Sequence, residues 1–258
     1  FPDWKGTVYP RHISKDRFLN YYENDLDFNT VELNFTYYAI PSPDTMISLT
    51  KKTSDKFEFV IKLYKGVTHD PFDYRLDKKP DNYKVKEYCE YFNNSIRYIR
   101  DTGKLPALLL QFPVFFYPSH ENTDYILNLK ELLKHDPIII EFRNSAWLKK
   151  NIFKLLKENN IGYCSVDEPE LPRLMPFVNE VTSDIAYMRF HGRNKNWFNA
   201  PVSVRYDYLY SKKELENFLP EIKKMDSSAE KTFIFFNNCH SGSAATNAKT
   251  LKDLLGLS

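Results

Sequence analysis

Short apolar runs alternate with longer amphipathic segments along most of this chain. Seven of the runs have the length of strands and are rich in β-branched and aromatic residues. They span Thr30 to Phe35, Phe57 to Leu63, Ala107 to Phe112, Ile138 to Phe142, Gly162 to Asp167, Ile185 to Phe190, and Thr232 to Phe236. Most are almost wholly apolar, which is typical of parallel strands that are covered on both faces.

The segments between these runs carry helix signals. From Tyr83 to Asp101, apolar residues recur at steps of three and four and therefore share one helix face. Ser42-Pro43 is a typical helix start, and Ser211 to Glu214 has the pattern of a capping box. Further helices are expected after a cap at Ser14, from Tyr125 to Leu133, from Ile152 to Leu156 after Ser145, and from about Ser243 to Leu255.

This alternation predicts parallel strands joined by right-handed helical crossovers. A TIM-like (β/α) barrel and a doubly wound open sheet both have that pattern. An open sheet would carry its ligand residues mainly at one switch point, whereas polar residues close nearly every strand of this chain. We therefore expect an α/β fold with a single TIM-like barrel domain over residues 1–258.

Composition narrows the class of protein. The chain has 36 basic and 34 acidic side chains, so its near-neutral charge does not demand a nucleic-acid partner. Its cysteines, Cys89, Cys164 and Cys239, lack short paired spacing, which argues against a disulfide framework or a zinc knot. No apolar stretch approaches the ~18 residues of a membrane span, and no secretory signal pattern is present. We expect a cytoplasmic protein with no membrane partner.

Each predicted strand finishes in hydrogen-bonding or ionisable side chains. The carboxyl ends of barrel strands meet at one mouth, so these side chains should converge there. A buried unpaired charge is costly, and such groups must therefore be paired or line a wet cavity. The candidates are Glu32, Asn34, Tyr37, Lys62, His69, Gln111, Glu141, Arg143, Asp167, Arg189, His191, Arg193, Asn237 and Asn238.

Two kinds of role are expected within this set. Proton transfer suits three carboxyl groups and one imidazole, those of Glu32, Glu141, Asp167 and His191. The carboxylates could equally neutralise the basic residues. Arginine favours bidentate contact with carboxylate or phosphate, so the basic residues could clamp an anion. Those basic residues are Lys62, Arg143, Arg189 and Arg193. The polar residues expected to bind substrate with them are Asn34, Tyr37, His69, Gln111, Asn237 and Asn238.

The sequence allows two roles for the Lys62 side chain. A desolvated lysine on a strand could form a Schiff base, but an ion pair with Glu32 or Glu141 is the stronger expectation. After the last strand, small residues over 237–243 could expose backbone N–H groups to a phosphate, or Ser241 or Ser243 could simply cap the helix.

Aromatic residues in loops and metal-ligand spacings also bear on the kind of ligand. A stacking wall for a sugar or base could form from aromatic residues in loops and at strand ends, namely Trp4, Tyr9, Tyr37, Tyr38 and Trp197. No metal is expected, because His-x-His and Glu-x-x-His pairs are absent and nearby Lys and Arg would repel a cation. No other cofactor is expected, because glycine-rich nucleotide loops are absent.

Seven ordered segments resemble those of the DUF72 (YecE-like) family. They are Val31–Asn34 with Tyr37-Tyr38 and Pro41, Phe57–Lys62 with Thr68-His69, Leu110–Pro113, Glu141–Arg143 with Ser145 and Trp147, Asp167 with Pro169, Arg189–Arg193, and Phe236–Asn238 with Gly242, Ala244, Asn247 and Ala248. The resemblance covers nearly the whole chain and implies a TIM-like barrel, but it implies no reaction. Family members begin with a strand before a Trp…Tyr-Pro segment. Here Trp4 and Tyr9-Pro10 are present without that strand, so we expect the first barrel strand to be missing from this chain.

The residues favour an enzyme that acts on a small anionic or phosphorylated, sugar-like substrate at the C-terminal mouth of the barrel. A nucleic-acid-binding or repair-related protein is an alternative, which predicts a continuous basic strip and salt-sensitive binding. The near-zero net charge argues mildly against it. A non-catalytic ligand-binding protein is the third hypothesis, and it predicts a pocket without acids or bases of perturbed pKa.

Overall fold

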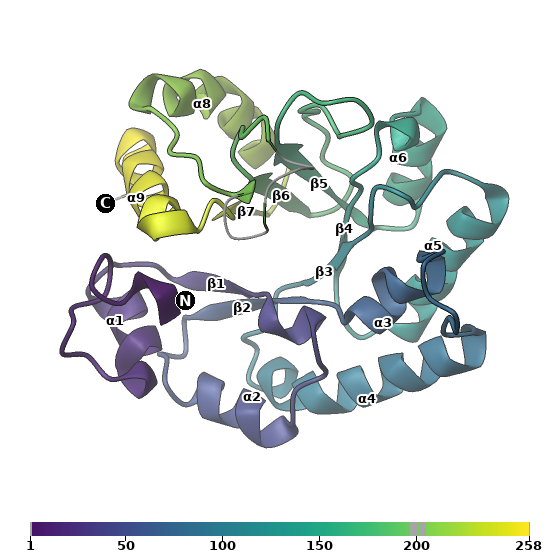
Figure 1. Cartoon of the computed structure of the whole chain (residues 1–258), viewed down its shortest axis with the longest axis horizontal. Helices are drawn as coiled ribbons and strands as arrows, with labels where there is room; N and C mark the ends of the chain where they lie inside the picture. Colours follow the sequence, from purple (N-terminus) through teal and green to yellow (C-terminus); the bar gives the residue numbers. More distant parts are fainter. Residues whose placement is uncertain (1, 197–200, 202–204, 258) are drawn as a thin grey trace.

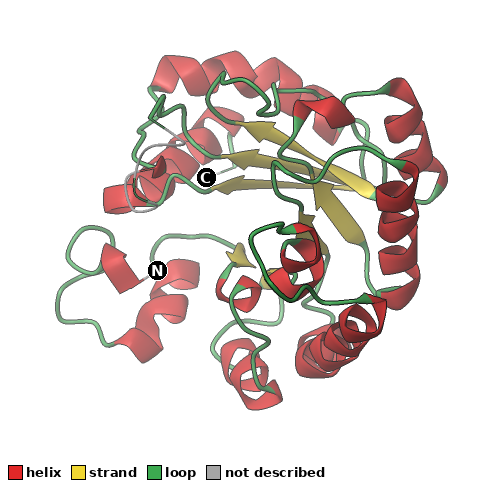
Figure 2. Ribbon diagram, turned by 45° about the vertical axis from the view of Figure 1, so that its right-hand side comes forward, coloured by secondary structure: helices red, strands yellow, loops and turns green. Residues whose placement is uncertain are grey.

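The computed structural model describes residues 2–196, 201 and 205–257, and it has a TIM-like (β/α) barrel fold. Seven parallel strands form one sheet whose order follows the chain, and the sheet curls into a nearly closed barrel with helices outside it (Figures 1 and 2). The strands are β1 (Thr30–Leu33), β2 (Glu58–Lys62), β3 (Leu108–Gln111), β4 (Ile138–Glu141), β5 (Gly162–Asp167), β6 (Ile185–Phe190) and β7 (Lys231–Phe236). The sequential order excludes a doubly wound sheet, which would reverse direction at a switch point.

The predicted strands are confirmed, although the ladders are shorter than the apolar runs. The strands end before the last residue of four runs, which are Phe35, Leu63, Phe112 and Phe142. Phe35 instead opens the 3-10 turn η3 (Phe35–Tyr37). The strand ladder ends where the chain turns toward the barrel mouth, whereas an apolar run continues as long as its side chains stay buried.

Helices follow most of the strands along the barrel wall, whereas residues 168–184, between β5 and β6, form an irregular loop. The helices are α1 (Phe18–Asn24), α2 (Pro43–Thr50), α3 (Lys65–Thr68), α4 (Asn82–Asp101), α5 (His120–Leu132), α6 (Lys150–Glu158), α8 (Lys212–Asp226) and α9 (Ser243–Leu255). The Ser42 side chain caps α2, and Ser211 with Glu214 forms the predicted capping box of α8. The expected cap at Ser14 is wrong: this residue precedes the 3-10 turn Lys15–Arg17, and α1 begins only at Phe18.

The core consists of the apolar strands and the helix faces that pack on them. Leu108–Leu110 of β3 and Ile138–Ile140 of β4 are buried at neighbouring positions of the ladder. The predicted apolar stripe of α4 is also buried, from Val85 to Ile99. Each large aliphatic side chain removed from water contributes about 1.5–3 kcal/mol, so this core gives the strand ends a rigid base.

Strands β1 and β7 end the sheet order, and side-chain contacts connect the two sides of the barrel. At the N-terminal end of the strands, Lys231 Nζ of β7 lies 2.6 Å from Glu58 Oε1 of β2. Toward the mouth, Tyr187 and Arg189 of β6 both reach Glu32 of β1. Absence of a first barrel strand from the chain stays a prediction.

The N-terminal segment lies against the loop after β7 and the start of α9. Trp4 Nε1 donates to the carbonyl of Cys239 at 2.9 Å. Trp4 and Tyr9 are 7% and 3% exposed and pack with Phe18 and Ala244. The expected stacking wall is therefore wrong for these two aromatics, because they belong to a hydrophobic cluster. Trp197 lies outside the described residues.

No helix in the described part of the chain is long and apolar enough to cross a lipid bilayer.

Candidate functional site

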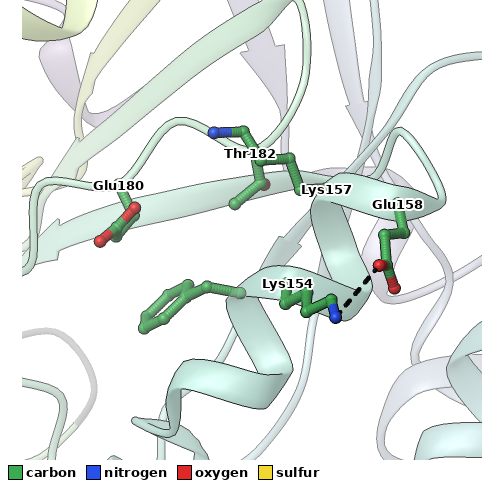
Figure 3. A pocket seen from close by; sticks show the side chains of 6 residues that line it. Lys154, Lys157, Glu158, Glu180 and Thr182 are labelled. Carbon is green, nitrogen blue, oxygen red and sulfur yellow. Dashed lines mark ion pairs between the residues drawn. The ribbon is translucent and has the colours of Figure 1, made fainter.

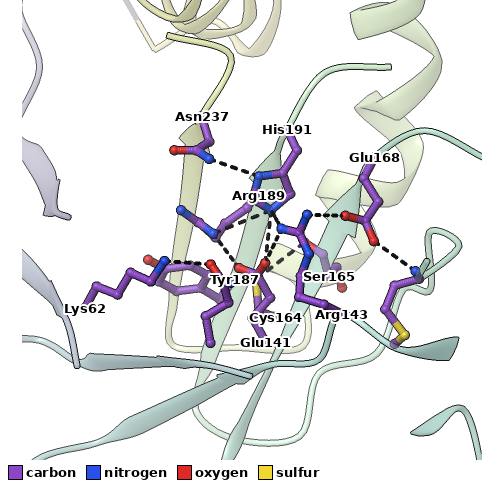
Figure 4. Close-up of polar contacts among 12 residues, drawn as sticks. Lys62, Glu141, Arg143, Cys164, Ser165, Glu168, Tyr187, Arg189, His191 and Asn237 are labelled. Carbon is purple, nitrogen blue, oxygen red and sulfur yellow. Dashed lines mark hydrogen bonds and ion pairs between the residues drawn. The ribbon is translucent and has the colours of Figure 1, made fainter. Parts of the chain in front are cut away.

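A buried arginine at the centre of the barrel holds two carboxylates from different strands. Arg189 of β6 donates to Glu141 Oε2 of β4 at 2.5 Å (Figure 4). It also donates to Glu32 Oε1 of β1 at 2.6 Å. All three side chains are at most 5% exposed. The sequence brings them together because each lies on an inward-facing position near the carboxyl end of its strand.

A second arginine shares one of these carboxylates. Arg143 Nη1 donates to Glu141 Oε1 at 2.8 Å, and Arg143 Nη2 lies 2.7 Å from Glu168 Oε2. Burial disfavours the ionised form of Glu141, but Arg189 and the other basic neighbours outweigh it and hold the pKa of Glu141 well below its usual value. Glu141 is therefore a fixed anion at the centre of the network.

Glu168 has a different ionisation. Burial raises the pKa of Glu168 to about 7, although Arg143 opposes this shift. The backbone N–H of Met175 donates to Glu168 Oε1 at 2.9 Å, which fixes the carboxyl group. Sequence reasoning missed Glu168, and the signal that could have found it is a second acidic residue directly after Asp167 at a strand end.

His191 connects Glu141 to the last strand. His191 Nδ1 lies 3.1 Å from Asn237 Nδ2, and His191 Nε2 lies 3.1 Å from Glu141 Oε1 and 3.0 Å from Arg143 Nη1. Burial lowers the pKa of His191 to about 3, so the ring is neutral at neutral pH. Both ring nitrogens are engaged, and this geometry favours a role in positioning Glu141. A role for His191 in proton transfer stays a prediction.

Lys62 lies on the other side of this network and contradicts one expectation. Its ammonium donates to Gln111 Oε1 at 2.6 Å and lies 4.4 Å from the centre of the Tyr37 ring. No carboxylate forms an ion pair with it among the described residues, so the expected pair with Glu32 or Glu141 is wrong. Arg189 already occupies both of those carboxylates. Burial, reinforced by Arg189, lowers the pKa of Lys62 to about 7.

His69 and Tyr37 complete the surroundings of this lysine. Their rings meet edge to face with centroids 4.8 Å apart. Burial and the nearby Lys62 lower the pKa of His69 to about 3, and Thr68 Oγ1 lies 3.0 Å from His69 Nδ1. We call Tyr37, Lys62, His69 and Gln111 the lysine subsite.

Asp167 belongs to a separate cluster on the β5–β6 side of the mouth. Arg193 Nη2 donates to Asp167 Oδ1 at 2.8 Å, and Arg193 Nε donates to Asp167 Oδ2 at 3.0 Å. The Tyr210 hydroxyl donates to Asp167 Oδ2 at 2.5 Å and accepts from the N–H of Gly192 at 2.9 Å. Asp167 therefore accepts hydrogen bonds from both Arg193 and Tyr210. Its expected role in proton transfer stays a prediction.

The two remaining asparagines differ in what they contact. Asn34 Nδ2 donates to Glu32 Oε1 at 2.9 Å and so joins the central network. Asn238 is fully buried and donates to the carbonyl of Tyr208 and to Asn247 Oδ1 of α9. These contacts connect the last barrel loop to α9, and they give Asn238 a packing role away from the lysine subsite.

Tyr187 is a member of the network that sequence reasoning missed. Its hydroxyl donates to Glu32 Oε2 at 2.7 Å, so both oxygens of that carboxylate are occupied. Tyr187 lies two residues before Arg189 on β6 and therefore shares its inward face, which is a signal that strand alternation carries.

The loop before α9 does not contain the expected serine cap. The helix begins after Gly242, which has a left-handed φ of 84°, and no side chain of the described residues caps it. A Cβ at Gly242 would lie 2.6 Å from a Val8 methyl carbon, so only glycine fits there. Phosphate binding by this loop stays a prediction.

The described residues contain no group of three His, Cys, Asp or Glu side chains arranged to hold a metal ion. The carboxylates of the mouth also face arginines, whose positive charge compensates theirs without a metal ion.

A surface pocket of about 320 Å³ lies elsewhere on the protein, beside α6 (Figure 3). Its lining residues are Phe153, Lys154, Lys157, Glu158, Glu180 and Thr182. Thr182 bonds to the carbonyl of Ile161, just before β5, so the pocket is at the N-terminal end of the strands. Lys154 and Glu158 pair with each other at 3.6 Å, and none of the predicted site residues lines this pocket.

Comparisons with known proteins agree with this architecture. A family model described as "Protein of unknown function DUF72" matches residues 1–258. The UPF0759 protein YunF of Bacillus subtilis is 29% identical over 264 residues, covering 97% of this chain and 91% of that protein.

Two solved structures are similar over nearly the whole chain. A DUF72 family protein from Thermotoga maritima has a TM-score of 0.89 at 39% identity, covering 99% of this chain and 95% of that one. A DUF72 family protein from Enterococcus faecalis has a TM-score of 0.79 at 29% identity, covering 95% of this chain and 96% of that one. With the strand-end network, the barrel and these matches in agreement, the chain belongs to the DUF72 family.

Proposed function

We propose that this protein is an enzyme that acts on a small anionic or phosphorylated, sugar-like substrate at the C-terminal mouth of the barrel. One observation carries the proposal. Each acidic residue of the strand-end set is already engaged by an arginine, and the lysine beside them has no carboxylate partner among the described residues.

The ion pairs account for the acidic side of the site. Glu32 and Glu141 are held by Arg189, and Asp167 is held by Arg193. Because these carboxylates are compensated from within the protein, they do not repel an anion strongly. What remains is Lys62, which when protonated is a buried positive charge without a counter-ion. An anionic ligand would supply that counter-ion.

The neighbours of Lys62 suit the same class of ligand. Gln111 offers an amide, and Tyr37 offers a half-buried aromatic face on which the apolar side of a sugar-like molecule could rest. His69 has a pKa lowered to about 3, so its ring is uncharged near pH 7. A positive charge, an amide and an aromatic side chain at the end of barrel strands are usual components of a site for small polar molecules.

The proposal is tested by a thermal-shift screen of the whole chain. The panel contains phosphorylated sugars, small organic acids and short DNA, each at low and at physiological salt. The same panel is applied to Lys62→Met, which removes the charge, and to Lys65→Met, a matched control whose lysine lies three positions further along the chain and pairs with Asp70.

We expect at least one small anion to raise the melting temperature of the wild type and of Lys65→Met by a few degrees, but not that of Lys62→Met. Incubation of that compound with the wild type, followed by mass spectrometry of the products, then tests for turnover. Binding without turnover would favour a ligand-binding protein. Stabilisation by DNA alone would contradict the proposal.

A further inference from the structure

We infer that Lys62 is a covalent centre, whose amine forms an imine with the carbonyl group of a small anionic aldehyde or ketone. This inference rests on the proposed function and narrows its substrate class to carbonyl compounds that carry a carboxylate or a phosphate. It is carried by the placement of the amine, by the identity of its partners and by its burial.

Lys62 is placed at the carboxyl end of β2, where a barrel presents reactive groups. Its residue is 9% exposed, and its ammonium nitrogen is held at 2.6 Å from Gln111 Oε1 of the adjacent strand β3. The Tyr37 ring lies on another side at 4.4 Å. Two rigid strands therefore fix the position of the amine, which a surface lysine does not experience.

Within the described part of the chain, the amine contacts neutral partners. A lysine paired with a carboxylate is kept protonated and cannot attack a carbonyl carbon. Lys62 instead contacts the amide of Gln111 and the ring of Tyr37, and neither retains the proton as a carboxylate would. This pairing is unusual beside Glu32 and Glu141, and it depends on Arg189 occupying both of those carboxylates.

Burial favours the free amine and is the largest influence on its pKa. The guanidinium groups of Arg189 and Arg143 act in the same direction, whereas the carboxylates of Glu141 and Glu32 oppose it. The net effect lowers the pKa of Lys62 to about 7, whereas an exposed lysine has a pKa of about 10.4. At pH 7 roughly half of the Lys62 side chains are unprotonated, against fewer than about one in a thousand for an exposed lysine.

The chemistry balances without an oxidant or reductant. The lone pair of Nζ attacks the carbonyl carbon, a C–N bond forms, and the π electrons of the carbonyl move to its oxygen. Transfer of a proton from nitrogen to that oxygen gives a carbinolamine. Loss of the hydroxyl group together with the remaining N–H proton, as one molecule of water, then gives the imine. A desolvated lysine beside another cation is a known way to obtain such a nucleophile.

The test traps this adduct in the whole protein. Wild type is incubated near pH 7 with glyoxylate, a carboxylate aldehyde, or with dihydroxyacetone phosphate, a phosphorylated ketone, and then reduced with borohydride. Peptide mass mapping locates the stable amine that results. We expect labelling of Lys62 at least tenfold above that of Lys65, with loss of this label in Lys62→Arg and its retention in Lys65→Arg.

A second readout needs no variant and holds even if Lys62→Arg folds poorly. Labelling of Lys62 in the wild type should rise through pH 7 and level off by about pH 8, while labelling of Lys65 should continue to rise toward pH 10. Labelling that spreads over surface lysines and spares Lys62 would overturn the inference.

The two proposals fail in different ways. If small anions stabilise both wild type and Lys62→Arg but neither carbonyl compound labels Lys62, the anion site stands and the covalent role is overturned. If no small anion stabilises the wild type and no label reaches Lys62, both are overturned. Labelling by one probe only identifies the anionic group that the site accepts.

Discussion

Replacement of Lys62 by methionine should stabilise the protein, and more so at low pH than at high pH. Methionine keeps the length of an unbranched side chain and removes the amine. The pKa of Lys62 falls from its ordinary value of 10.5 to about 7 in the folded protein, so between these values the unfolded chain binds more protons. Wild-type stability therefore carries a penalty that is complete below about pH 7 and disappears as the pH rises toward 10.5.

The magnitude follows from the difference in pKa. A difference of about 3.5, at about 1.4 kcal/mol for each pKa unit, corresponds to roughly 5 kcal/mol when the amine is protonated in both states. Linkage leaves about 2 kcal/mol of this penalty at pH 9, so the advantage of Lys62→Met should fall by about 2–3 kcal/mol between pH 6 and pH 9. Other titrating groups are shared by both proteins and cancel in the comparison.

Urea unfolding of wild type and Lys62→Met at pH 6 and pH 9, in one salt concentration, measures this change. Lys65→Met serves as the control, because its lysine is 40% exposed in the side chain and should show no such trend. If the free-energy difference between Lys62→Met and wild type is the same at both pH values, Lys62 has an ordinary pKa and the reasoning about its burial is refuted.

Three further substitutions test the central network. Arg189→Met should destabilise the protein by about 3–5 kcal/mol in urea unfolding, because it leaves buried carboxylates without their partner; a loss below about 1 kcal/mol would contradict the ion-pair geometry. Tyr187→Phe should cost about 1–2 kcal/mol by removing the hydrogen bond to Glu32, with unchanged labelling of Lys62. The raised pKa of Glu168, about 7, means that the folded state binds more protons than the unfolded state between about pH 4.5 and 7, so this group lowers stability as pH rises through that window. Glu168→Gln should remove that part of the pH dependence, and an unchanged profile would show that Glu168 stays ionised.

The strands and most helices could be predicted because burial and local capping leave direct marks on the sequence. Runs such as Leu108–Leu110 are apolar on both faces only when a parallel sheet is covered on both sides. The short helix α3 (Lys65–Thr68) was missed because four residues are too few to show a periodic pattern. The 3-10 turn after β1 was merged with the strand, since Phe35 is apolar like the residues before it.

The convergence of polar strand ends was predictable from topology, but their pairing was not. Alternation along β6 places Tyr187, Arg189 and His191 on one inward face. Which carboxylate then pairs with which cation depends on the width of the barrel and on side-chain reach. Arg189 is long enough to span from β6 to both β1 and β4, and that reach is why Lys62 is left with Gln111.

The most direct test of the central claim, that the mouth beside Lys62 is a substrate site, is a calorimetric titration of dihydroxyacetone phosphate into three proteins. These are the wild type, Lys62→Met and Lys65→Met, at pH 7 and low salt. We expect saturable binding to the wild type and to Lys65→Met with equal affinity, and binding at least tenfold weaker to Lys62→Met. Equal affinity for all three proteins would contradict it, as would the absence of any heat of binding both for dihydroxyacetone phosphate and in a parallel titration with glyoxylate.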